Sequence, residues 1–351
     1  MSHNSIRLGF IGAGWWATSN HIPTAQKRKE VILDSVCRLG TDELKRIKEK
    51  FNFEFASENY KELLERDLDG VVISSPHGLH YEHSKQALQK NINVLIEKPM
   101  ATRSSEAKEL FDMANKKNLS ILMSHGWNYL PESKFARKKL KEGVIGEIQN
   151  VVCNQSSGVR ELLSGEQWNL KGSEIMFSPE PKTWSDPEIA QGGYGLAQMT
   201  HALALTFFIT ELNPLRVFSI NNPNSKIELF KSIILECEKN ISATFTCSST
   251  HQNTYNNCEI KIYGTEGTII LIIGEKIKLE IFNKNKNKFT YKNEENIKNN
   301  IFEPTNNFID ILINPSSKNW SESELGLKTT YVLDASYRSQ KSIKFEDIDA
   351  E

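Results

Sequence analysis

Short apolar runs alternate with longer stretches of helical periodicity along the first 125 residues. Strands are predicted at residues 7–11, 31–37, 70–74, 93–97 and 119–124, and helices at residues 44–51, 60–65, 81–90 and 105–117. Apolar runs of this length, separated by single helices, are typical of a doubly wound parallel sheet. We therefore expect an α/β Rossmann domain over residues 1–125.

The pattern changes after Pro131. A charged helix is predicted at 132–141, a strongly apolar one at 194–209 and a last one at 321–342. Between them lie β-rich runs at 147–156, 215–220, 227–238, 241–248, 258–263 and 268–273, with turn signals at 239–240 and 264–267. Strands in direct succession indicate an antiparallel sheet, so we expect an α+β substrate and oligomerisation domain over residues 126–351, with the last helix packing back on the first domain. The Lys/Asn-rich stretch 284–300 is expected to be a solvated hairpin tip or mobile loop.

Composition excludes several classes of protein. The 351 residues carry 43 Lys and Arg against 44 Asp and Glu, without a basic block that would favour nucleic acid. We find no apolar run near the roughly 18 residues of a membrane span, and the first apolar run lacks the basic leader of a signal peptide. The five cysteines form no Cys-x-x-Cys pair, which favours free thiols in a cytoplasmic protein over disulfides or a zinc site.

A glycine turn follows the first predicted strand. Gly12, Gly14 and Ala17 form the pattern Gly-x-Gly-x-x-Ala, with Trp15 and Trp16 inside it. Such a turn, opening into a helix, lets a dinucleotide pyrophosphate approach the backbone and the N-terminal dipole of the helix. The sequence therefore predicts a nicotinamide dinucleotide site.

The end of the second strand decides between the two nicotinamide cofactors. Arg38 stands where an acidic residue would hold the ribose hydroxyls of NAD, and a guanidinium would instead bind a 2′-phosphate and stack on adenine. We therefore predict NADP. NAD remains the alternative, because Asp34 lies at a suitable distance from Gly14, although Val36 and Cys37 continue the strand beyond it.

A second cofactor segment is predicted after the third strand. Ser74, Ser75, Pro76 and His77 lie where the ribose or pyrophosphate should pass, and an ordinary strand-to-helix turn is an equal alternative. His80 is expected to form hydrogen bonds at a helix start. His77, His80 and His83 are spaced as His-x-x-His-x-x-His, but they spread around a helix without a completing carboxylate or thiol, so no metal is expected.

Glu97-Lys98-Pro99 ends the fourth strand and places a lysine at the edge of the sheet where ligands bind. Together with the glycine turn it resembles the Gfo/Idh/MocA oxidoreductases. The resemblance extends to the strand segment 69–76 with His80 and to Gly143–Ile148, at the entry to the second domain. It also includes the turn at residues 263–268, and Gly192-Gly193 followed by His201. Members of this family usually pair a Rossmann domain with an open antiparallel sheet, and they oxidise or reduce sugar and polyol hydroxyls, so the resemblance implies both for this chain.

The resemblance implies a site. Lys98 would bind the substrate oxygen, and His201 or His125 would move its proton; Glu97 and Lys98 would also border the cofactor. Trp127, Tyr129 and Tyr194 are predicted substrate contacts. Ala197 replaces an aspartate found in many members, and no arginine precedes the aromatic residue near Trp127, which favours a neutral sugar. A homodimer or homotetramer is expected from the resemblance.

Two alternative functions remain open on the sequence. One is a redox-assisted glycoside hydrolase or lyase that keeps its nicotinamide tightly bound. The other is a non-catalytic sensor that retains only the nucleotide site.

Overall fold

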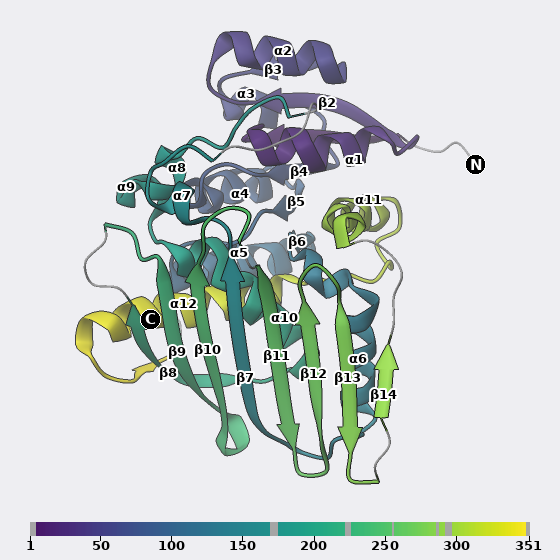
Figure 1. Ribbon diagram of the computed structural model, residues 1–351. Helices are drawn as coiled ribbons and strands as arrows, with labels where there is room; N and C mark the ends of the chain where they lie inside the picture. Colours follow the sequence, from purple (N-terminus) through teal and green to yellow (C-terminus); the bar gives the residue numbers. More distant parts are fainter. Residues whose placement is uncertain are drawn as a thin grey trace.

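The computed structural model describes residues 5–168, 175–221, 226–254, 256–285, 288–291 and 297–348. Figure 1 shows two parts, a smaller sheet flanked by helices above and a broad sheet below. The first sheet takes its strands from residues 6–123, and the second takes its strands from residues 148–347.

The first sheet has six parallel strands in the order β3-β2-β1-β4-β5-β6, which is the Rossmann order. Its strands are β1 (Ile6–Ile11), β2 (Val31–Cys37), β3 (Phe55–Ser57), β4 (Gly70–Ile73), β5 (Asn93–Ile96) and β6 (Ile121–Met123). Its helices are the π-helical turn η1 (Ala17–His21), α1 (Ile22–Gln26), α2 (Thr41–Phe51), α3 (Tyr60–Leu64), α4 (His80–Gln89) and α5 (Ser104–Lys117). The central strands are continuous apolar runs because helices cover both faces of the sheet. The predicted doubly wound sheet is confirmed.

The chain returns to this first sheet near its end. Helix α11 (Glu303–Ile313) was not predicted, yet its Phe308 and Ile309 are buried in one core of the first sheet. The long helix α12 (Ser323–Ser342) packs against α5 of the first part and against the second sheet. Met123 of β6 also donates its backbone N–H to the Ser321 carbonyl at 2.8 Å. The two parts are therefore joined by packing as well as by sequence.

The second sheet has nine described strands in the order β14-β13-β12-β11-β7-β10-β9-β8-β15. They are β7 (Ile148–Ser157), β8 (Pro214–Asn221), β9 (Phe230–Cys237), β10 (Ile241–Ser249), β11 (Asn257–Gly264), β12 (Gly267–Ile273), β13 (Lys278–Asn283), β14 (Lys288–Tyr291) and β15 (Glu346–Asp347). All neighbours are antiparallel except β7 and β10. The predicted open antiparallel sheet is thus confirmed, with one parallel pair. The predicted Lys/Asn-rich loop includes part of the β13–β14 hairpin, and residues 286–287 and 292–296 of it lie outside the described residues.

One face of the second sheet is covered by α6 (Pro131–Lys141), α10 (Thr200–Thr210) and α12, while the other faces the viewer in Figure 1. The predicted apolar helix divides into a π-helical turn η4 (Gly195–Met199) followed by α10. Helix α10 is apolar all around because it lies between other elements rather than at the surface. All five cysteines are buried free thiols. None of the helices in the described ranges is long and apolar enough to span a membrane.

Candidate functional site

The glycine turn lies against the end of β4. Gly12 has a φ of +85°, and a Cβ there would lie 2.3 Å from the backbone nitrogen of Ser75, so only glycine fits. A Cβ on Gly14 would meet nothing closer than the Gly12 carbonyl at 3.9 Å, which leaves its outer side open to a ligand. Ala17 is buried at the start of η1, where a larger side chain would separate the helix from the sheet.

Glu97 connects the glycine turn to the end of β5, which Lys98 follows. Its Oε1 accepts hydrogen bonds from Trp16 Nε1 and His21 Nε2, both at 2.9 Å, and His21 Nδ1 lies 2.7 Å from Thr305 Oγ1 of α11. Burial would raise the pKa of Glu97, but hydrogen bonding and charge from His21, with Lys98 and Ser124, lower it well below its usual range. Glu97 is therefore a buried carboxylate that fixes the strand end, and Trp16 is one of its donors.

Hydrogen bonds of Ser74 and His80 fix the position of the segment after β4. Ser74 Oγ donates to the Gly12 carbonyl at 3.3 Å. The ring nitrogens of His80, the first residue of α4, lie 2.7 Å from the Pro99 carbonyl and 2.8 Å from the Ser75 carbonyl. His80 therefore has the hydrogen-bonding place predicted at a helix start, and it locks the Ser75-Pro76 turn onto the Lys98-Pro99 segment.

Arg38 follows β2 at the same edge of the sheet. Its guanidinium carbon lies 4.3 Å from the ring centroid of Phe177, and that of Arg46 lies 5.6 Å from the same ring. Asp34 lies inside β2, fully buried, and forms ion pairs with Arg7 and Arg66. Two guanidinium groups thus gather where the adenosine end of a dinucleotide is expected, and the alternative Asp34 is engaged elsewhere.

Lys98 connects β5 of the first part to the helix that carries His201. Its Nζ donates a hydrogen bond of 2.8 Å to the carbonyl oxygen of Ala197, one helical turn before His201. Burial lowers the pKa of Lys98, and Glu97 opposes the shift. The strand-end lysine and the histidine helix, predicted from separate motifs, therefore meet.

Two further imidazoles lie beside this lysine. The rings of His125 and His201 are 6.2 Å apart, and neither ring nitrogen of buried His125 has a hydrogen-bond partner in the described structure. Burial lowers the pKa of His125 to about 4, and burial with the charge of Lys98 lowers that of His201 well below its usual value. Both imidazoles are therefore neutral at pH 7 and able to accept a proton.

The predicted substrate contacts differ in accessibility. Trp127 is partly exposed, and its ring lies 5.3 Å from that of His201. Tyr129 and Tyr194 are buried, with hydroxyl groups hydrogen-bonded to Asn307 and Ser157, each at 3.0 Å. Of the three, only Trp127 presents surface beside His201.

Three aromatic side chains from the segment after β7 lie around these residues, and sequence reasoning did not single out one of them, Phe177. Trp168 lies 5.6 Å from Trp15, Phe177 lies against Arg38, and Trp184 lies 5.8 Å from both His77 and the Lys98 Nζ. This segment has no regular periodicity, so its only signal was the density of aromatic residues. His21, Thr305 and Arg46 were also missed, because their roles depend on contacts distant in sequence.

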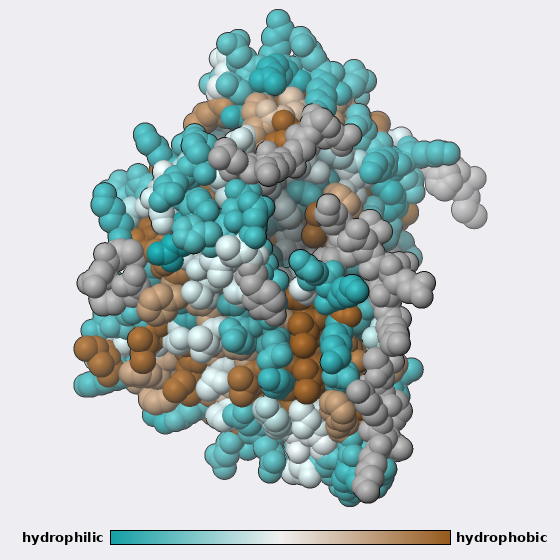
Figure 2. Space-filling view, in the orientation of Figure 1, coloured by the Kyte–Doolittle hydropathy of each residue, from teal (hydrophilic) through white to brown (hydrophobic). Residues whose placement is uncertain are grey.

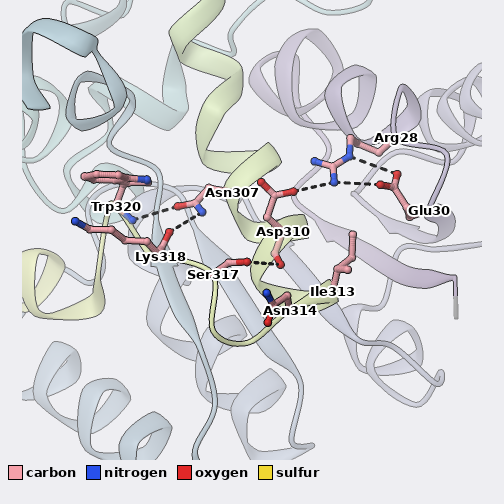
Figure 3. Close-up of a pocket in the computed structure, with 9 residues that line it drawn as sticks. All are labelled: Arg28, Glu30, Asn307, Asp310, Ile313, Asn314, Ser317, Lys318 and Trp320. Atoms are coloured by element: carbon pink, nitrogen blue, oxygen red, sulfur yellow. Dashed lines mark hydrogen bonds and ion pairs between the residues drawn. The ribbon is translucent and has the colours of Figure 1, made fainter. Parts of the chain in front are cut away.

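A separate surface hollow of about 460 Å³ lies at the opposite edge of the first sheet (Figure 3). Glu30, which precedes β2, lines it with Arg28 and Asp310, and Arg28 forms ion pairs with both carboxylates. Ligands of open parallel sheets bind at the carboxyl ends of the strands, so this hollow is not the dinucleotide site. Among the described residues, no three His, Cys, Asp or Glu side chains are grouped to hold a metal ion.

Comparison with known proteins agrees with the geometry. Residues 6–125 match the sequence profile described as "Oxidoreductase family, NAD-binding Rossmann fold", and residues 134–270 match the "GFO/IDH/MocA C-terminal domain". The chain belongs to the GFO/IDH/MocA family. The matching family is described as an oxidoreductase family with an NAD-binding Rossmann fold, as the sequence motifs predicted.

Two curated relatives of this GFO/IDH/MocA protein are named for reactions on sugars. It is 33% identical over 152 residues to a dTDP-3,4-didehydro-2,6-dideoxy-alpha-D-glucose 3-reductase of Actinomadura kijaniata, covering 43% of this chain and 46% of the relative. It is 22% identical over 284 residues to a D-xylose 1-dehydrogenase [NADP(+)] of Haloarcula marismortui, covering 76% and 72%. The first match spans less than half of the relative's length, so activity does not transfer with it.

Solved structures show the same fold. Levoglucosan dehydrogenase in complex with NADH and L-sorbose superposes with a TM-score of 0.83 over 99% of both chains, at 14% sequence identity. This identity supports the architecture alone.

Proposed function

We propose that this protein transfers a hydride between NADP and a carbon that carries a hydroxyl or keto group in a neutral sugar or polyol. The observation that carries the proposal is the 2.8 Å hydrogen bond from Lys98 Nζ to the Ala197 carbonyl. It brings the strand-end lysine of the nucleotide-binding part to the helix that carries His201. The cofactor and substrate sides of the site therefore meet at one ammonium group.

Each residue has a distinct task in this proposal. Nicotinamide, when bound, supplies the hydride acceptor or donor. Lys98 uses its remaining N–H donors to bind the substrate oxygen and to stabilise the negative charge that develops there. In the oxidation direction, the hydroxyl proton passes to the neutral imidazole of His201, with His125 as the second candidate base, while the carbonyl bond forms.

The cofactor is assigned to residues of the first part. Gly12, Gly14 and the start of η1 would receive the pyrophosphate, and Ser74 to His77 would border the adjoining ribose. Arg38, together with Arg46, would bind the 2′-phosphate of NADP. Support comes from the ion pairs of Asp34, which leave that carboxylate unavailable to ribose hydroxyls.

The substrate is assigned to the space beside Trp127 and Trp184. Aromatic rings favour the apolar faces of a neutral sugar, and the relatives that act on sugars agree with this class. The five buried free thiols support a cytoplasmic location.

We also propose that the protein forms a homodimer or homotetramer through the outward face of the second sheet. Figure 2 shows brown areas on this face, and the exposed apolar and aromatic side chains of the strands are Val152, Leu215, Ile220, Phe230, Ile234, Tyr263 and Phe282. Four of them, Leu215, Ile220, Phe230 and Ile234, lie on the neighbouring strands β8 and β9, and exposed apolar surface of this kind marks interaction sites.

The test of the function is turnover on a panel of neutral sugars and polyols with NADP and NAD. Nicotinamide absorbance would be followed in both directions, and Lys98→Met would be assayed beside the unchanged protein. We expect reversible hydride transfer that Lys98→Met abolishes. Release of a leaving group without net change in absorbance would instead support redox-assisted elimination, and cofactor binding without turnover would support a sensor.

A further inference from the structure

One buried residue, Glu228, accepts hydrogen bonds from three consecutive backbone amides at the start of the histidine helix, two with its carboxylate and one with its backbone carbonyl. Glu228 immediately precedes β9, and its two oxygens accept the N–H groups of Gly193 at 2.9 Å and Gly195 at 3.1 Å. The backbone carbonyl of Glu228 accepts the N–H of Tyr194 at 2.9 Å. Amides at a helix start lack partners within the helix, so this residue supplies them and places a negative charge at the positive end of the dipole.

The close packing around Glu228 explains why positions 193 and 195 are glycines. A Cβ on Gly193 would lie 2.4 Å from the Glu228 carbonyl oxygen, and a Cβ on Gly195 would lie 2.8 Å from the Tyr337 hydroxyl and 3.2 Å from Glu228 Oε1. The Tyr337 hydroxyl, from α12, donates a further hydrogen bond to the same carboxylate. The turn is therefore built to lie directly on Glu228.

A buried lysine balances the charge. Lys231 is fully buried, its Nζ has no hydrogen-bond partner in the described structure, and it lies 3.9 Å from the ring centroid of Tyr337. Burial lowers the pKa of Lys231 to about 8, and the charge of Glu228 opposes the shift. Lys231 and Tyr337 thus lie beside the same turn, with the Tyr337 hydroxyl on the carboxylate.

The turn that Glu228 binds, residues 193–197, also carries the carbonyl oxygen that accepts the hydrogen bond of Lys98. The N–H of Ala197 bonds to the Gly193 carbonyl at 3.0 Å, and the Ala197 carbonyl accepts Lys98 Nζ at 2.8 Å. The side chain at position 197 is a methyl group, so the backbone position alone determines where Lys98 finds its acceptor. From Glu228 to Lys98 the connection runs through hydrogen bonds and one short turn.

We propose that Glu228, supported by Tyr337 and Lys231, is a positioning residue that fixes the Ala197 carbonyl and thereby the ammonium group of Lys98. This inference rests on the proposed function of Lys98. Loss of the Glu228 contacts would let the η4 turn shift, and Lys98 would lose a fixed acceptor for its protonated form. The titratable groups that surround Lys98 would remain: the charged Glu97 and the imidazoles of His77, His80, His125 and His201.

The test measures Lys98 directly, without turnover. The Glu228→Gln variant keeps the size of the side chain but places an amide donor against the backbone N–H groups. Competitive acetylation with acetic anhydride over a pH series, read by mass spectrometry of the peptide that holds Lys98, gives the pH at which its amine becomes reactive. We expect this midpoint to move to lower pH in Glu228→Gln, and kcat to fall roughly 10- to 100-fold, with cofactor affinity within about twofold of the unchanged protein. Glu49→Gln, the same substitution on an exposed residue of α2, is expected to change neither.

An unchanged Lys98 midpoint in a folded Glu228→Gln protein would overturn the proposal. If circular dichroism shows that this variant does not fold, Tyr337→Phe decides, because it removes one donor and leaves both amide contacts; a smaller shift in the same direction is expected, and no shift would overturn the proposal. The proposed function has its own test in Lys98→Met. Retained turnover in Lys98→Met with a shifted midpoint in Glu228→Gln would refute the role of Lys98 and leave its positioning by Glu228 intact.

Discussion

Lys98 donates its hydrogen bond to the backbone carbonyl of Ala197, at 2.8 Å, and not to a side chain. Many members of the family are expected to carry an aspartate at position 197, and this chain has a methyl group there. The backbone carbonyl holds the lysine without adding a negative charge. Burial can therefore lower the pKa of Lys98 with only Glu97 opposing it.

His201 is predicted to act as the base. His201→Asn should lower kcat by about 10²-fold or more, because a positioned base contributes roughly 10²–10⁴-fold to such reactions. In the unchanged protein, kcat/KM should fall as the pH drops below the lowered pKa of this imidazole, because the base becomes protonated. Steady-state kinetics of the variant measure the fall in kcat, and a pH profile of kcat/KM in the unchanged protein measures the loss at low pH. His125→Asn provides the comparison: if it alone removes the acid limb, His125 is the base instead.

The adenosine end is predicted to prefer NADP. Arg38→Ala should weaken NADPH binding about 10- to 100-fold and NADH binding much less, because a hydrogen bond to a charged group contributes roughly 1.5–3 kcal/mol. Tryptophan fluorescence titration with each cofactor measures the ratio, since Trp15 and Trp16 lie in the glycine turn. Arg28→Ala, at the opposite edge of the sheet, is the control. Equal losses for NADPH and NADH would mean that Arg38 does not contact a 2′-phosphate.

Acid should destabilise the fold through its buried histidines. His125 has a folded pKa of about 4 against an ordinary value of 6.5, so between these values the unfolded chain binds more protons and stability falls as the pH falls. The full shift corresponds to at most about 3 kcal/mol for this residue. Urea unfolding between pH 7 and pH 4 should show a shallower loss of stability in His125→Gln than in the unchanged protein.

The sequence predicted most of the fold because its signals are local. The glycine turn, the apolar runs of β1, β2, β4 and β5, and the apolar helix before Glu211 all depend on neighbouring residues. Helix α11 was missed because it follows an irregular stretch, and its place is decided by Phe308 packing on a distant sheet. Strand β9 begins at Phe230 and not at residue 227, because Glu228 bonds to the Gly193–Gly195 turn instead of extending the strand.

In the candidate site, too, residues with local sequence signals were predicted, and residues placed by distant contacts were not. Gly12 and Lys98 were predicted from their motifs at the strand ends, and His201 was predicted from the family resemblance. Their partners could not, because His21 and Thr305 reach Glu97 from elements that only the fold brings together. The Phe177 contact with Arg38 comes from a segment without periodicity.

The outward face of the second sheet is predicted to be a subunit interface. Changing Ile234, which is 44% exposed on β9, to lysine should place a charge within the apolar surface and shift the protein towards monomer. Light scattering coupled to size-exclusion chromatography measures the change in mass. Ile313→Lys is the matched control, because Ile313 is equally exposed, at 44%, but lies on α11. A monomeric unchanged protein would refute the interface.

The most direct test of the account is single-turnover hydride transfer by Lys98→Met and Lys98→Arg, each loaded with NADP and mixed with a sugar that the unchanged protein oxidises. Lys98→Met should bind NADP normally and lose hydride transfer by about 10³-fold or more, because no ammonium group remains to stabilise the charge on the substrate oxygen. Lys98→Arg, which keeps the charge but not the geometry, should retain a small part of the rate. Hydride transfer by Lys98→Met at the rate of the unchanged protein would contradict the account.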